Sequence, residues 1–359
     1  MKKYGYKGGL ILGLILVSTG MFLFYPAGNV RNFGFFLFAL FVMFSGSAFL
    51  ETAANPYITV LGDPEGAARR INLAQSFNGL ASVMAGIIGR TFILSGITHT
   101  AAQDAAMSHT QLTDYLNKEA SSVQKPFLII GLGVLVVAIL ISRTSLPAIV
   151  EEGEGEELHE KKPFLQRMSE LLKEKELMAG VWAQFFYVGG QACIFGFMVL
   201  FAERVAGMNE KTASLFLIAG SVCFMAGRFI GTLLMKVVHP VKLLTIYSLL
   251  NAFLILLAVF LHGNLPVYAL LAVDFFMSIM FPTIFSLSIR GLGKKTKEGS
   301  SLVIMAIVGG AVCALLLGFI ADRANIQWAY LVPEFCFVYI FFYSWKRLKT
   351  KELNVAAAH

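Results

Sequence analysis

A glutamate stands inside a long apolar segment, in the stretch FLETAANPYITVLG from Phe49 to Gly62. Asn55 follows Glu51 by one helical turn, so on a helix the two side chains share a face. Pro56 cannot donate a hydrogen bond to the carbonyl of Thr52, and we expect the helix to bend there. A charged side chain in hydrocarbon costs about 2.5–3.5 kcal/mol. The pattern therefore predicts a polar kink that faces the interior of a helix bundle or a water-filled cavity.

A carboxyl group in such a place is suited to proton transfer. The neutral acid is far cheaper in a bilayer than the carboxylate, so Glu51 can take up a proton from one side and release it to the other. We therefore predict that Glu51 is a proton-coupling residue. The alternative is that Glu51 only holds a neighbouring helix through a hydrogen bond.

Polar side chains also line one face of other apolar segments, and amides and aromatic rings prevail among them. Such groups suit a neutral, hydroxyl-rich solute, because amides bond to hydroxyls and aromatic rings stack on the apolar face of a sugar. The alternative is helix packing with a polar lining. The predicted substrate-binding residues are Asn78, Gln75, Asn55, Gln184, Tyr187 and Gln191, with Asp274 and Phe281 as accessory positions.

Two arginines, Arg90 and Arg228, lie nearer the ends of such segments. At these positions an arginine more often extends its charge to the interface or braces helices than binds substrate. We therefore expect a structural role for both.

The composition is that of a membrane protein with several spans. Of the 359 residues 57% are hydrophobic and 14% charged, and the mean hydropathy is +0.71, whereas soluble domains are about a quarter charged. The predicted fold is all-α. The sequence shows ten apolar segments of about 17 or more residues, long enough to span, at 8–25, 33–61, 71–97, 126–142, 178–201, 212–236, 241–261, 265–289, 299–320 and 328–345.

The charges between these segments predict the topology. Most of the 29 Lys and Arg residues fall on the side of the N-terminus, which by the positive-inside rule places both termini in the cytoplasm. The same bias explains the net charge of +7 without a nucleic-acid partner. We expect a four-span N-terminal part over 1–142, a cytoplasmic linker over 143–176 and a six-helix part over 177–359. In the linker, PFLQRMSELLKEKEL has the apolar spacing of a surface helix.

Enzyme chemistry is not indicated. The sequence has no nucleophile–base pair, phosphate-binding loop or metal-ligand cluster. Its four cysteines stand in apolar segments without the spacing of a metal site. We expect no metal and no cofactor.

Several stretches together resemble the fucose permease family of sugar:proton symporters in the major facilitator superfamily. They are FLETAANPYITVLG, RRINLAQSFNG, AQFFYVGGQACIF, GRFIGTLLM, MSIMFPTIFSLSIRGLG and GSSLVIMAIVGGA. The resemblance implies twelve helices in two six-helix halves, with alternating access to a sugar site at the midplane. It matches Glu51 to the family's fourth-helix glutamate and Asn78 to its fifth-helix asparagine, residues used in proton coupling and sugar binding. Gln75 lies in the same motif.

The chain departs from this pattern in two respects. It has ten spans, and KKYGYKGGL is similar to the end of the basic loop between the second and third helices, so we expect the first two helices to be missing. A fragment, a start assigned to an internal Met and a shortened protein would all explain this. Phe281 stands where the family often has tyrosine, and Asp274 is an acid that the pattern does not include.

The predicted function is proton-coupled symport of a neutral monosaccharide, L-fucose or a related hexose, across the inner membrane. The expected partners are the sugar, protons and the lipid bilayer, with the protein as a monomer. The alternatives are a passive facilitator or nutrient sensor on the same scaffold, or an inactive truncated fragment. Accumulation of sugar that depends on a pH gradient would separate the symporter from the facilitator.

Overall fold

The computed structural model describes residues 5–30, 32–88, 107–147 and 164–356, and over these ranges the chain is helical with short turns. Contacts divide the chain into two compact units. Unit 1 comprises Met1–Tyr57 and Met84–Ile149, and unit 2 comprises Ile58–Val83 and Val150–His359. Each unit is described by itself.

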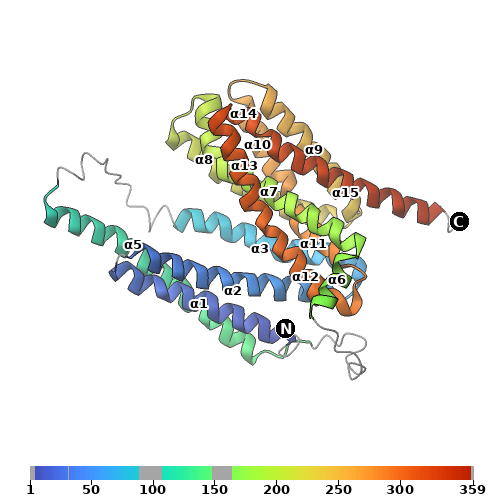
Figure 1. Ribbon diagram of the computed structural model, residues 1–359, viewed down its shortest axis with the longest axis horizontal. Helices are drawn as coiled ribbons and strands as arrows, with labels where there is room; N and C mark the ends of the chain where they lie inside the picture. The colour runs from blue at the N-terminus through green and yellow to red at the C-terminus, as the bar shows by residue number, and fades with distance from the viewer. Residues whose placement is uncertain (1–4, 31, 89–106, 148–163, 357–359) are drawn as a thin grey trace. The chain divides into compact units, whose positions relative to one another are not determined.

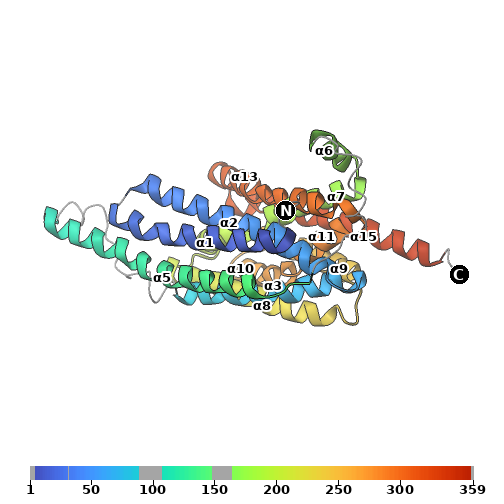
Figure 2. The ribbon, with the colours of Figure 1, turned by 90° about the horizontal axis from the view of Figure 1, so that it is seen from below.

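Unit 1 contains three long helices, α1 (Gly5–Val30), α2 (Phe33–Val60, up to Tyr57 in this unit) and α5 (His109–Arg143) (Figures 1 and 2). The hydroxyl of Ser18 on α1 donates to the carbonyl of Gly131 on α5 at 2.9 Å. Glycine lets α1 and α2 approach closely, because a Cβ on Gly20 would lie 2.5 Å from the main-chain nitrogen of Met43. Small residues at helix contacts are typical of membrane helices.

Helix α5 is longer than the segment 126–142 that the apolar pattern predicts, because it begins in a polar stretch. The Ser108 hydroxyl accepts from the backbone N–H of Gln111, and the Gln111 side chain accepts from the backbone N–H of Ser108. This reciprocal capping box starts the helix well before the apolar residues. Pro126 lies inside α5 and Pro56 inside α2, and both helices continue past their proline.

Unit 2 contains the remaining helices, and α7 lies at its centre beside α8, α10, α11, α13 and α15 (Figure 1). The helices are α3 (Ala67–Ile88, up to Val83 in this unit), α6 (Phe164–Leu172), α7 (Lys175–Ala206), α8 (Glu210–Leu234), α9 (Pro240–Phe260), α10 (Leu265–Met277), α11 (Met280–Ile289), α12 (Thr296–Met305), α13 (Gly309–Arg323), α14 (Ile326–Ala329) and α15 (Leu331–Ala356). Short 3₁₀ turns precede α3 at Pro64–Gly66 (η1), α12 at Gly293–Lys295 (η3) and α13 at Ala306–Val308 (η4).

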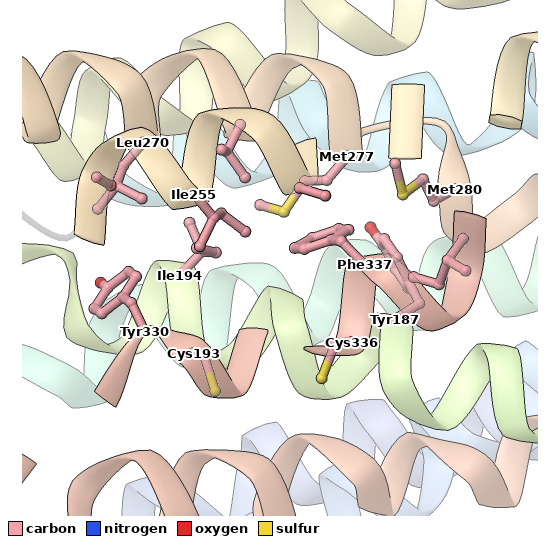
Figure 3. Packing of buried hydrophobic residues seen from close by; sticks show 14 of the residues in the cluster. Tyr187, Cys193, Ile194, Ile255, Leu270, Met277, Met280, Tyr330, Cys336 and Phe337 are labelled. Atoms are coloured by element: carbon pink, nitrogen blue, oxygen red, sulfur yellow. The ribbon is translucent and has the colours of Figure 1, made fainter. Parts of the chain in front are cut away.

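The core of unit 2 forms around α7 (Figure 3). Tyr187 and Phe201 on α7 are fully buried together with Tyr330 and Phe337. The Phe201 and Tyr330 rings lie 4.5 Å apart between centroids. Gly190 lets α15 approach α7, because a Cβ there would lie 3.1 Å from the Phe337 ring.

Nine helical spans within the described residues, some of them made of two consecutive helices, are long and apolar enough to cross a membrane. They correspond to nine of the ten predicted segments, and the all-α membrane fold is confirmed. Three predicted segments each contain a break: 265–289 is divided into α10 and α11, 299–320 into α12, η4 and α13, and 328–345 between α14 and α15. The tenth segment, 71–97, corresponds to α3, which is not among the nine, and its residues 89–97 lie outside the described residues.

The predicted helix in the linker is present as α6. Leu171 is only 1% exposed and packs in a cluster with Leu177 and Val303. Arg167 Nη1 lies 3.0 Å from Glu298 Oε1 on α12. Helix α6 therefore packs against the rest of unit 2 with its apolar side, as its amphipathic pattern indicates. The acidic run before it lies outside the described residues.

Candidate functional site

Glu51 and Asn55 lie on α2, one helical turn apart as the sequence predicts. Glu51 is half-buried and Asn55 is buried. Near the end of the same helix, the Tyr57 hydroxyl donates to the carbonyl of Pro147 at 3.2 Å. Unit 1 therefore holds a carboxyl group and an amide on one helix face, both shielded from solvent to different degrees.

The predicted residues on α3 are joined to each other. Gln75 is half-buried and Asn78 is exposed. Asn78 Nδ2 donates to Gln75 Oε1 at 3.3 Å. A side-chain amide offers two N–H donors and a carbonyl acceptor, so Asn78 presents groups that can bond a hydroxyl-bearing solute.

Arg228 on α8 binds Gln75 directly. Its Nη1 donates to the main-chain oxygen of Gln75 at 2.5 Å and to Gln75 Oε1 at 3.3 Å, while its Nε donates to the main-chain oxygen of Ser278 at 2.9 Å. The guanidinium also lies 4.6 Å from the centroid of the Phe224 ring. Arg228 is only 4% exposed, so a buried cation links α3, α8 and the end of α10.

The bracing role expected for Arg228 agrees with these bonds. The pairing of Arg228 with Gln75 was not predicted, although Gln75 was a predicted site residue. The partners are far apart in the chain, so helical spacing could not pair them. The available signal was a charged residue within a span, which is by default a candidate functional residue.

A second polar contact joins α3 to α11. Asn72 Nδ2 donates to Thr283 Oγ1 at 3.0 Å and to the Ala68 carbonyl at 2.8 Å. The Thr283 hydroxyl donates to the Ile279 carbonyl at 2.6 Å. Asn72 was not predicted as a site residue, although it precedes Gln75 by three residues and so lies on the same side of α3.

Helix α7 carries three of the predicted residues, in different surroundings. Gln184 and Tyr187 are fully buried, and Gln191 is half-buried. The Tyr187 ring packs against Phe281 on α11, edge to face, with centroids 6.2 Å apart. The phenol extends from α7 toward the junction of α10 and α11, where Met277 and Met280 lie (Figure 3). Tyr187 and Phe281 are therefore brought together, while Gln184 has no access to solvent.

Asp274 on α10 is fully buried. Within the described part of the chain, neither of its carboxyl oxygens has a hydrogen-bond partner. It faces Gly220 on α8, where a Cβ would collide with Oδ2 of Asp274. The glycine thus leaves the space that the carboxyl group occupies.

The arrangement in unit 2 is suited to binding rather than to bond-breaking chemistry. It combines amides on α3, a buried guanidinium on α8 and aromatic rings on α7 and α11. Over the described residues, no three His, Cys, Asp or Glu side chains are placed to hold a metal ion. Amides beside aromatic rings can bond hydroxyls and stack on a sugar ring.

Known proteins resemble this chain over almost its whole length. Residues 1–306 match the Major Facilitator Superfamily. The chain is 40% identical to the L-fucose-proton symporter of Escherichia coli over 354 residues, which are 98% of this chain and 80% of that protein. It is 37% identical to a glucose/galactose transporter of Brucella abortus over 347 residues, 96% of this chain and 79% of that protein.

A solved structure shows the same fold at a similar level of identity. The crystal structure of the major facilitator transporter FucP in the outward conformation matches with a TM-score of 0.87 and 39% identity, over 97% of this chain and 84% of that chain. The expected family is thus confirmed, and it is a family of transporters rather than of enzymes. The chain belongs to the Major Facilitator Superfamily and, within it, to the fucose permease family.

Proposed function

We propose that this protein is a symporter that carries a neutral monosaccharide, L-fucose or a related hexose, together with protons. The observation that carries the proposal is the 40% identity to an L-fucose-proton symporter over 98% of the chain. Buried and half-buried polar groups on apolar helices support it, because a carrier for a hydroxyl-rich solute needs them at the depth of the membrane. The sugar and the proton would bind within the helical bundle, and alternating access would carry both across.

In this proposal Glu51 carries a proton and the amides of Asn78 and Gln75 bind sugar hydroxyls. Asn78 is the exposed member of the α3 pair and Gln75 the one held by Arg228. The remaining proposed substrate contacts are Asn55, Gln184, Tyr187 and Gln191, with Phe281 as an aromatic surface for the sugar ring and Asp274 as an accessory residue. Gln184 and Tyr187 are buried here and would have to become accessible during transport.

The proposal includes a location and a topology. The protein would lie in the inner membrane as a monomer, with both termini in the cytoplasm as the positive-inside rule indicates. Its halves would be 1–142 and 177–359, joined by the linker 143–176. The expectation that two helices of the twelve-helix pattern are not part of this chain stays a prediction.

Transport into proteoliposomes tests the function and separates the alternatives. A symporter accumulates labelled L-fucose above the outside concentration when the outside is acidic, and a proton ionophore abolishes the accumulation. A facilitator only equilibrates the sugar, with or without the gradient. Failure to transport L-fucose, galactose or glucose under either condition would contradict the proposal and favour an inactive chain. Competition among the three sugars then identifies the preferred one.

A further inference from the structure

Asp274 is a fully buried acid on α10. Neither of its carboxyl oxygens has a hydrogen-bond partner within the described ranges. The carboxyl group lies in the space left by Gly220 on α8. A buried carboxylate with neither a cation nor a donor is very costly. In this conformation the group is therefore a neutral carboxylic acid.

The titratable groups on the helices packed against α10 do not change this conclusion. Those that face α10 around Asp274 include Tyr187 on α7, Cys223 and Arg228 on α8, and Tyr247 on α9, with Tyr330 at the end of α14. Phenols and thiols are neutral in such surroundings. Arg228 is the cation among them, and it donates to Ser278 and Gln75.

Arg228 is held at the end of the helix that carries Asp274. Its Nε holds the carbonyl of Ser278, four residues after Asp274, and four residues of α-helix rise about 6 Å. The other end of the guanidinium, Nη1, is held by both oxygens of Gln75 on α3. Withdrawal of α3 would release Nη1 for a nearby anion.

We propose that Asp274 is a second proton-binding site of the transporter. Arg228 controls the protonation of Asp274 by changing its own partner from Gln75 to Asp274. The inference rests on the proposed symport. While α3 is in place, Asp274 keeps its proton. When α3 withdraws, the guanidinium pairs with the carboxyl group, the O–H bond breaks, and the proton leaves to water as the carboxylate forms. Return of α3 removes the cation, and Asp274 binds a proton again.

The proton-to-sugar ratio tests the site. In proteoliposomes, alkalinisation of the medium and uptake of labelled sugar are measured together for the wild type, Asp274→Asn and Glu334→Gln. Glu334 is a matched control, because it is another buried acid, on α15, with one carboxyl oxygen lacking a partner among the described residues. We expect the ratio to fall by about half in Asp274→Asn and to stay unchanged in Glu334→Gln. A wild-type ratio in Asp274→Asn would overturn the proposal.

Infrared spectroscopy tests the protonation of Asp274 without transport. We expect the detergent-solubilised wild type at neutral pH to show the C=O stretch of a protonated carboxylic acid that Asp274→Asn lacks. Identical spectra in this region would overturn the proposal even if both proteins were inactive. A wild type that shows the band but never accumulates sugar would instead contradict the proposed symport, so the two failures are distinguishable.

Variants of Arg228 test the exchange of partners. In Arg228→Met the proton on Asp274 would have no cation to displace it, so we expect accumulation to be lost, while exchange between two equal pools is only weakened because Gln75 loses its partner. Arg228→Lys keeps the charge and should recover part of the accumulation. Full accumulation in Arg228→Met would overturn the role of Arg228. If that variant does not exchange sugar, an Arg228→Lys protein that exchanges but accumulates nothing would overturn it as well.

Discussion

Arg228 on α8 holds Gln75 on α3 by both of its oxygens, the main-chain carbonyl at 2.5 Å and the side-chain Oε1 at 3.3 Å. The same Oε1 accepts from Asn78 Nδ2 at 3.3 Å. Because a guanidinium only donates, the Gln75 amide must turn its oxygen toward Arg228 and its NH₂ group away from it. Hydrogen bonds to a charged group are also stronger than neutral ones. A buried cation thus sets the orientation of an amide that in turn holds exposed Asn78.

The first prediction concerns Asn78. We expect Asn78→Ala to weaken sugar binding by about 2-fold to 10-fold, since a hydrogen bond contributes about 0.5–1.5 kcal/mol. The side chain is exposed, so the free energy of unfolding should change by less than about 0.5 kcal/mol. Calorimetric titration with sugar and unfolding in mixed micelles measure the two quantities. Phe77→Ala, at an exposed neighbour on α3, is the control, and equal affinities for both variants would contradict a sugar contact.

The second prediction concerns the contact between Asn72 and Thr283. Asn72 Nδ2 donates to Thr283 Oγ1 at 3.0 Å, and both residues are buried. We expect Asn72→Leu and Thr283→Val each to lower the free energy of unfolding by about 1–3 kcal/mol, because a buried group loses its partner. The double variant should show a coupling energy of about 0.5–1.5 kcal/mol. Additive effects in this cycle would show that the bond does not stabilise the protein.

Local patterns in the sequence predict the helices because each depends on residues close together in the chain. Nine of the ten predicted segments correspond to helical spans long enough to cross a membrane. Glu51 and Asn55 lie one turn apart on α2 as expected. Hydropathy alone does not mark the start of α5. The capping box at Ser108 and Gln111 extends α5 into a segment that hydropathy alone assigns to a connection.

The partners within the site could not be predicted in this way. Arg228 and Gln75 are 153 positions apart, and Asn72 and Thr283 are 211 apart. Helical periodicity gives the face of each residue but not the helix that packs against that face. The sequence therefore predicts the polar faces of α3 and α7. The hydrogen bonds that residues on α3 form with α8 and α11 depend on tertiary packing, which the sequence pattern does not give.

The third prediction compares two adjacent leucines on α6. Leu171 is 1% exposed among Leu177 and Val303, while Leu172 is 52% exposed. We expect Leu171→Ala to lower the free energy of unfolding by about 2–5 kcal/mol through lost burial and a cavity. Leu172→Ala should change it by less than about 0.5 kcal/mol. Unfolding in mixed micelles measures both. Equal effects would show that Leu171 of α6 does not pack against Leu177 and Val303 as observed.

The fourth prediction compares two glycines. A Cβ on Gly309 of α13 would collide with the main-chain oxygen of Phe185 on α7, and a backbone atom cannot rotate away. We expect Gly309→Ala to lower the free energy of unfolding by at least about 1–3 kcal/mol, as overpacking does. Gly196 on α7 has nothing within 4 Å of such a Cβ, so Gly196→Ala should raise stability by about 0.5–1 kcal/mol through its helix propensity. The opposite order would contradict close packing of α7 and α13.

The last prediction concerns Glu51, the half-buried acid on α2. Gln keeps the size and polarity of a protonated glutamate but cannot release a proton. If Glu51 couples protons to sugar, a carrier that resembles the protonated form should bind sugar and exchange it between two equal pools, because exchange needs no deprotonation. Accumulation does need it, since the empty carrier must return without its proton, so Glu51→Gln should lose accumulation.

Uptake of labelled L-fucose with and without an acidic outside, together with exchange at equal pH, measures both properties. The matched control is Glu203→Gln, an acid near the end of α7 to which no transport role is assigned, and both activities should persist in it. Accumulation by Glu51→Gln at the wild-type level would exclude Glu51 as the coupling residue. Loss of exchange along with accumulation would show instead that Glu51 is required for sugar binding or folding, because a residue that only couples protons leaves exchange intact.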